Sequence, residues 1–272
     1  MALSFWKYEG AGNDFVVLDE RSGSFDPQRE TVRALCDRHF GVGADGLMIL
    51  ENDPQAQFRM RYFNADGGES TMCGNGGRCI ALFAEHLGIG GSTKHFIGAD
   101  GPHTAEIVSL DEREGGTVTL HMANVEEVMH EDQYFFLNTG SPHYVEFVKD
   151  ADAVDVAGLG REIRSSESFA AIGGTNVNFV EITGDGKLKV RTYERGVEEE
   201  TLACGTGATA SAIAAYIYRQ SHRTRFEIET RGGRLEVSFS TPDGLRFGDI
   251  RLTGPAKKIF SGIIEPEFLT VK

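Results

Sequence analysis

Two cysteines in this chain begin nearly identical glycine-rich stretches. Cys73 is followed by Gly-Asn-Gly, Cys204 is followed by Gly-Thr-Gly, and each stretch leads into a mostly apolar segment. A cysteine at the start of a helix lies at the positive end of the helix dipole, which favours its thiolate form. The glycines leave backbone N–H groups accessible to a carboxylate or a phosphate. One such cysteine is most often a small buried hydrophobic residue, but two at equivalent positions indicate a paired chemical role.

Paired thiols of this kind suit proton transfer at one carbon atom. If two similar halves of the chain face each other, one sulfur as a thiolate can remove a proton while the other, as a thiol, returns one. The configuration of the carbon is then inverted without a cofactor. The carbanion formed on the way is the difficult species, and N–H groups aimed at an adjacent carboxylate would stabilise its charge.

The cysteines belong to a longer internal repeat. Tyr62 and Tyr193 each precede a cysteine by eleven residues, and the same order of strands and glycine turns follows each apolar segment. We therefore interpret the chain as a duplicated domain, with halves at residues 1–122 and 123–257. The tail, residues 258–272, is expected to pack back on the first half.

The segments behind the two cysteines predict buried helices. Residues 79–87 and 208–218 are apolar on nearly every side, which is typical of a helix enclosed by other elements. Gly88 can end the first of these helices as a C-cap. Short strands linked by turns surround both segments in the sequence. We therefore expect the α/β (α+β) class, with two pseudo-symmetric halves, each a curled, mostly antiparallel sheet wrapped around a central buried helix.

A surface helix is expected earlier in the chain. The stretch "DPQRETVRALCDRHFG" offers Asp26 as an N-cap, Pro27 as the first helical residue and Gly41 as the terminator. Its apolar face would place Cys36 in the core of the first half.

Composition argues against several kinds of partner. The formal net charge of −14 predicts no binding to nucleic acid and no binding to an acidic membrane surface, because both would repel the chain. No apolar run approaches the roughly 20 residues that a membrane span needs, and no signal-peptide pattern is visible, so we expect a cytoplasmic protein. The four cysteines are too few for a disulfide scaffold and are not spaced as zinc ligands.

Seven stretches together resemble the diaminopimelate epimerase family, and the resemblance covers essentially the whole chain. They are "GAGNDFVVLD", "GVGADGL", "YFNADGGESTMCGNGGRC", "GSPHYV", "TNVNFV", "YERGVEEETLACGTGA" and "GPAKKIF". The resemblance implies two similar α/β halves around central helices, and an enzyme that interconverts LL- and meso-diaminopimelate in lysine and peptidoglycan synthesis. It also implies a small diamino-dicarboxylic acid substrate, no pyridoxal phosphate, no metal and a homodimer.

The resemblance also implies roles for individual residues. Cys73 and Cys204 match the catalytic acid–base pair. The residues implied to bind substrate are the N–H donors Gly74, Asn75, Gly205 and Thr206, and the side chains of Asn13, Asn64, Asn176, Glu194 and Arg195. Arg195 would hold a carboxylate bidentately. His143 and Glu194 are implied to tune the protonation of the thiols.

The chain departs from the family pattern at two positions. Ser141 stands where an asparagine is common, and its shorter side chain reaches less far toward a substrate. Gly46 stands where some members carry a side-chain contact, so that here only backbone can serve.

Simpler interpretations of the same residues stay open from the sequence. Asn13 follows two glycines and could be a turn residue, Arg195 could form a surface ion pair, and His143 could be a packing histidine. Cys36 and Cys79 are assigned to the core.

Three other functions compete with the epimerase. A two-cysteine racemase acting on proline or hydroxyproline would use the same chemistry, although the asparagine and Glu-Arg positions favour a substrate with a second polar end. A thiol–disulfide redox protein is disfavoured because no C-x-x-C pair occurs. A binding module without chemistry would not explain a cysteine in both halves.

Overall fold

The chain folds into two compact units. The computed structural model describes residues 2–71, 73–220 and 222–269. Unit 1 comprises Met1–Leu120 and Pro255–Lys272, and unit 2 comprises His121–Gly254. In the described residues, no helix is long and apolar enough to cross a membrane.

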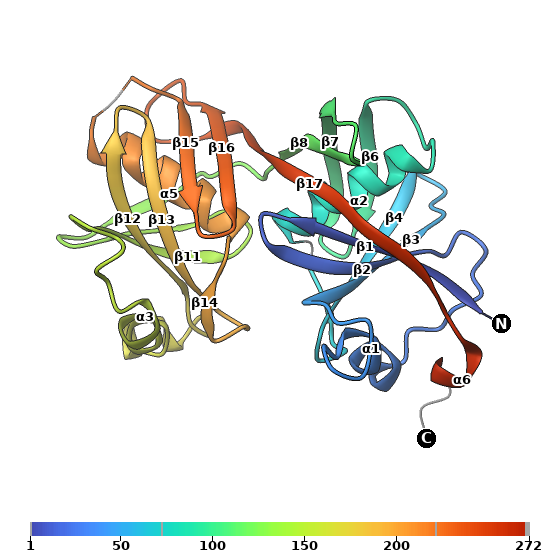
Figure 1. The fold of residues 1–272 in the computed structure, drawn as a ribbon. Coiled ribbons are helices and arrows are strands. Elements are labelled where there is room, and N and C mark those ends of the chain that lie inside the picture. The colour runs from blue at the N-terminus through green and yellow to red at the C-terminus, as the bar shows by residue number, and fades with distance from the viewer. Residues whose placement is uncertain (1, 72, 221, 270–272) are drawn as a thin grey trace. The chain divides into compact units, whose positions relative to one another are not determined.

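Unit 1 is a barrel of eight strands around one helix (Figure 1). Strand pairings run around the ring and close it where β8 and β1 both pair with β17. Two neighbouring pairs, β2–β3 and β4–β6, are parallel, because helical crossovers join them. The elements are β1 (Leu3–Gly10), β2 (Asn13–Asp19), α1 (Arg29–Cys36), β3 (Gly46–Glu51), β4 (Phe58–Asn64), β5 (Glu69–Ser70), α2 (Gly74–His86), β6 (Thr93–Gly98), β7 (Gly101–Leu110), β8 (Gly115–His121), β17 (Gly248–Ile264) and α6 (Pro266–Leu269).

Unit 2 repeats this plan. Its parallel pairs are β11–β12 and β13–β15, again joined by helical crossovers. The first part of β17, as far as Gly254, belongs to this unit and pairs with β16. Met122 hydrogen-bonds to Ile250 of β17, and Val125 bonds to Phe247, directly before that strand. The elements are β9 (Val128–His130), β10 (Phe135–Asn138), β11 (Pro142–Phe147), α3 (Val156–Arg164), α4 (Glu167–Ala170), β12 (Asn176–Gly184), β13 (Lys187–Glu194), β14 (Glu199–Thr201), α5 (Gly205–Tyr218), β15 (Arg225–Thr230) and β16 (Gly233–Ser240).

The enclosed helices confirm the predicted fold class. Residues 74–84 of α2 are all buried, as are residues 207–215 of α5. A helix that must be apolar on every side can only sit inside a sheet that curls around it. Gly88 follows α2 with a φ of 69° and donates its N–H to the carbonyl of Glu85, so the predicted glycine C-cap is confirmed.

The surface helix α1 is shorter than predicted. It begins at Arg29 rather than beside Asp26, and Gln28 occupies the N-cap without a side-chain cap bond. The Asp26 carboxylate instead accepts a hydrogen bond from the Gln28 amide at 2.6 Å. The helix ends at Cys36 and not near Gly41, because Asp37 leaves the helical conformation with a ψ of 126°.

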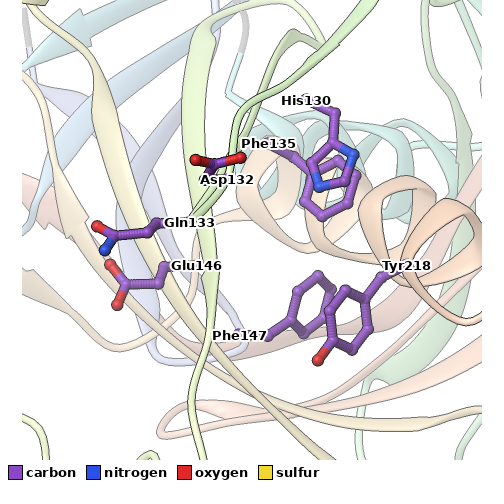
Figure 2. Close-up of a pocket in the computed structure, with 7 residues that line it drawn as sticks. All are labelled: His130, Asp132, Gln133, Phe135, Glu146, Phe147 and Tyr218. Carbon is purple, nitrogen blue, oxygen red and sulfur yellow. The ribbon is translucent and has the colours of Figure 1, made fainter.

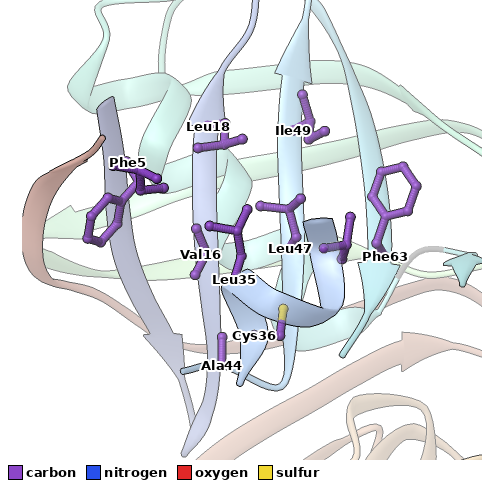
Figure 3. Packing of buried hydrophobic residues seen from close by; sticks show 11 residues of the cluster. Phe5, Val16, Leu18, Leu35, Cys36, Ala44, Leu47, Ile49 and Phe63 are labelled. Carbon is purple, nitrogen blue, oxygen red and sulfur yellow. The ribbon is translucent and has the colours of Figure 1, made fainter. Parts of the chain in front are cut away.

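The apolar face of α1 packs on the outer side of the unit 1 sheet. Figure 3 shows Leu35 and Cys36 of this helix against Val16, Leu47 and other strand side chains. The Cys36 side chain is buried, and burial raises its thiol pKa to about 12. Cys36 therefore lies in the core, as expected from the helix face that carries it.

The strand register corrects one detail of the predicted repeat. Tyr62 pairs with Met48 across β3 and β4, and Thr192 pairs with Asn178 across β12 and β13. Met48 and Asn178 correspond, because each lies against the glycine three residues after the cysteine of its unit. Thr192, not Tyr193, is therefore the counterpart of Tyr62. Thr192 precedes its cysteine by twelve residues, against eleven for Tyr62, because the connection to the helix is longer in unit 2.

Candidate functional site

Cys204 stands at the N-terminus of the enclosed helix of unit 2. It is the N-cap residue of α5, with extended backbone (φ −117°, ψ 113°), and Gly205 follows as the first helical residue. Its Sγ lies 3.3 Å from the Thr206 hydroxyl. The thiol is thus placed at the positive end of the helix, where N–H groups remain for an anion.

His143 is linked to this sulfur through the Thr206 hydroxyl. Its Nε2 is 2.9 Å from the Thr206 hydroxyl, and its Nδ1 is 3.1 Å from the Asn178 amide nitrogen. The ring is fully buried. Burial, and secondly the positive charge of Arg195, lower the pKa of His143 to about 3. The imidazole is therefore neutral throughout the physiological range.

Neutral His143 makes unfolding depend on pH. Its pKa is about 3 in the folded protein and about 6.5 in an unfolded chain, so the unfolded state binds the extra proton between these values. This contribution to stability is fully present above about pH 6.5 and is lost as the pH falls toward 3. We expect its slope to approach 1.4 kcal/mol per pH unit at most.

Urea unfolding from pH 7 to 4.5 checks this expectation. In the His143→Gln variant, the slope of the unfolding free energy against pH should fall by an amount equal to the uptake of up to one proton. The contributions of the carboxyl groups are the same in both proteins and cancel in the comparison. Equal slopes in parent and variant would contradict a buried neutral His143.

A second group of polar side chains gathers beside His143. Asn176 pairs with His143 in the strand register, and its amide donates to Ser141 Oγ at 2.8 Å. Its carbonyl accepts the Arg195 backbone N–H at 2.9 Å. The Arg195 guanidinium makes two long contacts, to Ser141 Oγ at 3.4 Å and to the Gly174 carbonyl at 3.5 Å. Ser141 Oγ thus contacts both the Asn176 amide and the Arg195 guanidinium.

The acidic residues near Arg195 bear on its interpretation as a surface ion-pair residue. Glu194 is the last residue of β13, directly before it. Glu198, a nearby acidic residue, pairs with Arg164 at 2.8 Å. Glu198 is therefore held by Arg164, while the Arg195 guanidinium contacts Ser141 and Gly174.

Cys73 occupies the matching position in unit 1. It is the N-cap residue of α2 (φ −98°, ψ 134°), followed by Gly74. Its Sγ lies 3.6 Å from Asn13 Oδ1, which also accepts from the Asn75 amide at 3.5 Å. The Asn13 amide donates to Asp45 at 2.6 Å. This bond turns the carbonyl oxygen of Asn13 toward the sulfur, so Asn13 is more than a turn residue.

Arg78 is a buried cation beneath this half of the site. It is fully buried, and its guanidinium donates to the Gly74 carbonyl at 3.2 Å, to Asn75 Oδ1 at 2.8 Å and to the Pro255 carbonyl at 3.3 Å. Burial lowers its pKa. Sequence reasoning missed both Arg78 and Asp45. The signal for Arg78 was a charged residue between the glycines and the apolar segment of a helix predicted to be buried.

Asn64 and Gly46 face each other across β3 and β4. Asn64 ends its strand at an exposed turn and accepts the Gly67 backbone N–H. A Cβ on Gly46 would lie 2.5 Å from the Phe63 carbonyl and 2.6 Å from the Tyr62 ring. The site therefore has no space for a side chain at Gly46, and only its backbone can contribute.

The remaining thiol, Cys79, is enclosed within α2. It is fully buried, and burial raises its pKa well above the usual range. Across residues 2–71, 73–220 and 222–269, no cluster of three or more His, Cys, Asp or Glu side chains could hold a metal ion.

A hollow of about 320 Å³ opens elsewhere on unit 2. Figure 2 shows its lining, in which His130 stacks on Phe135 and Phe147 stacks on Tyr218. Tyr218 is the last residue of α5 and Cys204 precedes its first, which separates them by about 20 Å along the helix. The hollow is therefore distinct from the cysteine half-site.

Comparison with solved structures defines the class of fold. A PhzF-family phenazine biosynthesis protein of Bacillus anthracis matches with a TM-score of 0.76 at 13% identity, over 97% of this chain and 99% of that one. A probable proline racemase from Agrobacterium radiobacter K84 matches with a TM-score of 0.71 at 15% identity, over 98% and 95%. The chain thus has the two-unit fold found in these racemase and PhzF-type proteins.

Comparison of sequences then gives the family. The family model for diaminopimelate epimerase matches residues 5–127 and 135–259. The diaminopimelate epimerase of Flavobacterium psychrophilum is 46% identical over 263 residues, covering 96% of this chain and 100% of the relative. That of Chlorobaculum tepidum is 42% identical over 94% and 98%. The chain belongs to the diaminopimelate epimerase family, a family of isomerases, which confirms the resemblance carried by its motifs.

Proposed function

We propose that this protein interconverts LL- and meso-diaminopimelate by proton transfer between two cysteines. The observation that carries the proposal is the repeated placement of a thiol, Cys73 or Cys204, at the N-cap of an enclosed helix. Membership of the diaminopimelate epimerase family supports the substrate.

In the proposed reaction one sulfur begins as a thiolate and the other as a thiol. The thiolate takes the proton from the α-carbon, leaving the electron pair on carbon and the adjacent carboxylate. The thiol then donates its proton to the opposite face, so the two sulfurs end with exchanged protonation states. N–H groups at residues 74–75 and 205–206 would hold the carboxylate and stabilise the developing charge. The reaction requires both sulfurs to reach one carbon.

The second polar end of the substrate would be bound by side chains of both units. Arg195 suits a carboxylate because its guanidinium can donate two parallel hydrogen bonds. Asn176 and Glu194 adjoin it, and Asn13 and Asn64 would contribute from unit 1. His143 and Glu194 would tune the protonation of the thiols.

The same proposal includes a metabolic pathway and an oligomeric state. Lysine and peptidoglycan synthesis in the cytoplasm follows from the proposed substrate, and no pyridoxal phosphate or metal would be needed. We expect a homodimer, so sedimentation should give about twice the chain mass of 29.7 kDa.

An assay on two substrates tests the proposal. Purified protein with reductant should convert LL-diaminopimelate and leave L-proline unchanged. Proline turnover is the second candidate, favoured by the fold shared with a probable proline racemase; turnover of proline alone would replace the proposed substrate.

Isotope labelling tests the two-base step. In deuterated water at early times, deuterium should enter the α-carbon of the inverted product and not that of the recovered substrate. Equal labelling of both would contradict two separate bases.

A further inference from the structure

The two units differ in what lies beneath their enclosed helices. A Cβ on Gly76 of α2 would lie 3.2 Å from Met48 Sδ, and one on Gly207 of α5 would lie 2.4 Å from Asn178 Oδ1. Each glycine is three residues after its cysteine. Met48 and Asn178 are therefore counterparts, and the glycine at 207 makes space for the amide.

The strand register extends this correspondence. In the parallel pair β2–β3, Phe15 lies opposite the residue two positions before Met48. In the parallel pair β11–β12, His143 lies opposite the residue two positions before Asn178. Phe15 is therefore the counterpart of His143. Unit 1 thus holds Phe15, Met48 and Tyr62 where unit 2 holds His143, Asn178 and Thr192. The imidazole, amide and hydroxyl of unit 2 thus correspond to two aromatic rings and a thioether in unit 1.

The Asn178 amide has one orientation. Its nitrogen donates to the Tyr144 carbonyl at 2.8 Å, and its oxygen accepts the Thr192 hydroxyl at 2.9 Å. A carbonyl can only accept, so the nitrogen must face Tyr144. The same nitrogen lies 3.1 Å from His143 Nδ1, and Nδ1 is then an acceptor.

This orientation sets the direction of the remaining bonds. Because neutral His143 accepts at Nδ1, its proton is on Nε2, which donates to Thr206 Oγ1 at 2.9 Å. The Thr206 hydroxyl, having accepted, directs its own proton to Cys204 Sγ at 3.3 Å. Every bond in this relay points its donor toward the sulfur.

We propose that Asn178 is a positioning residue that, through His143 and Thr206, stabilises the thiolate of Cys204. A hydrogen bond donated to a thiolate favours the charged form, and the relay delivers one without a charged group. The proposal rests on the two-cysteine function proposed above, although its test needs no substrate and can fail or succeed independently of the activity.

Cys73 has a different arrangement. It faces the carbonyl oxygen of Asn13 and the buried charge of Arg78, whereas the relay supplies the donor to Cys204. Arg195, which directly follows Glu194 at the end of β13, is the charged residue that acts on His143, and Cys204 is the N-cap of α5. Arg195 helps to keep His143 neutral, which preserves its role as an Nε2–H donor.

Alkylation of each sulfur by iodoacetamide, followed by peptide mass spectrometry over pH 5–10, tests the relay. The alkylation rate of Cys204 is measured in a Cys73→Ala background. Thr206→Val removes the hydroxyl and keeps the backbone N–H, so the alkylation rate of Cys204 at neutral pH should fall about tenfold, a loss typical of one hydrogen bond to a charged group. Thr206→Ser should restore the rate to within about twofold.

The pH profile separates the relay from a packing effect. Thr206→Val and Asn178→Leu should both move the midpoint of alkylation upward by about one pH unit and leave the rate at high pH unchanged. A loss of access would lower the high-pH rate instead. If Asn178→Leu does not fold, the comparison of Thr206→Val with Thr206→Ser tests the relay by itself.

Unit 1 supplies the matched control. In a Cys204→Ala background, Thr206→Val, Asn178→Leu and the counterpart variant Met48→Leu should each leave the midpoint for Cys73 unchanged. An unmoved Cys204 midpoint in Thr206→Val, or an equal shift at Cys73, would overturn the proposal.

Discussion

Replacing either Cys73 or Cys204 with alanine should reduce epimerisation of diaminopimelate by a factor of about 10² to 10⁴. Each sulfur would supply one of two proton transfers, and a positioned acid or base contributes on this order. Because the reaction needs both, neither single variant should retain substantial activity. Initial rates in both directions, measured with reductant present, check this.

The control is a cysteine outside the half-sites. Cys36→Ala truncates a buried thiol in the α1 core and should keep its turnover although it loses some stability. Circular dichroism should show that the Cys73 and Cys204 variants stay folded. Retention of more than a few percent of turnover by either would remove that sulfur from the proposed pair.

Replacing Arg195 with lysine should lower kcat/KM by about 10²-fold. A lysine keeps the charge but cannot donate two parallel hydrogen bonds to a carboxylate. The contacts of Arg195 inside the protein are long, at 3.4 and 3.5 Å, so its removal should cost substrate binding more than folding. Steady-state kinetics with diaminopimelate, together with the thermal midpoint, separates these effects.

Arg164 is the matched control because it is a nearby arginine with a partner of its own. It pairs with Glu198 at 2.8 Å and donates to the Gly173 carbonyl. Arg164→Lys should therefore leave kcat/KM within a few-fold of the parent. A similar loss of kcat/KM in both variants would mean that Arg195 acts by holding the segment at Gly173 and Gly174 in place, and not by binding the substrate.

The local sequence predicted the main elements of the fold. Glycine turns and apolar segments behind Cys73 and Cys204 were sufficient to predict two enclosed helices, since a helix without a polar face must be surrounded. The repeat then implied similar halves. The start of α1 was predicted wrongly because Asp26, Gln28 and nearby polar residues all offer cap-like hydrogen bonds, and a local pattern does not choose among them.

The sequence alone determined that this protein carries two thiols at equivalent helix N-termini and belongs with the diaminopimelate epimerases. Only the tertiary structure decided what surrounds each thiol. Asn178 and Thr192 meet His143 through strand pairing between residues far apart in the chain, and Arg78 reaches the Pro255 carbonyl from the other end of the sequence. Strand register is a long-range property, set by which strands meet and in which alignment, and no local pattern specifies it. The repeat makes the halves look alike, and the register makes Cys73 and Cys204 different.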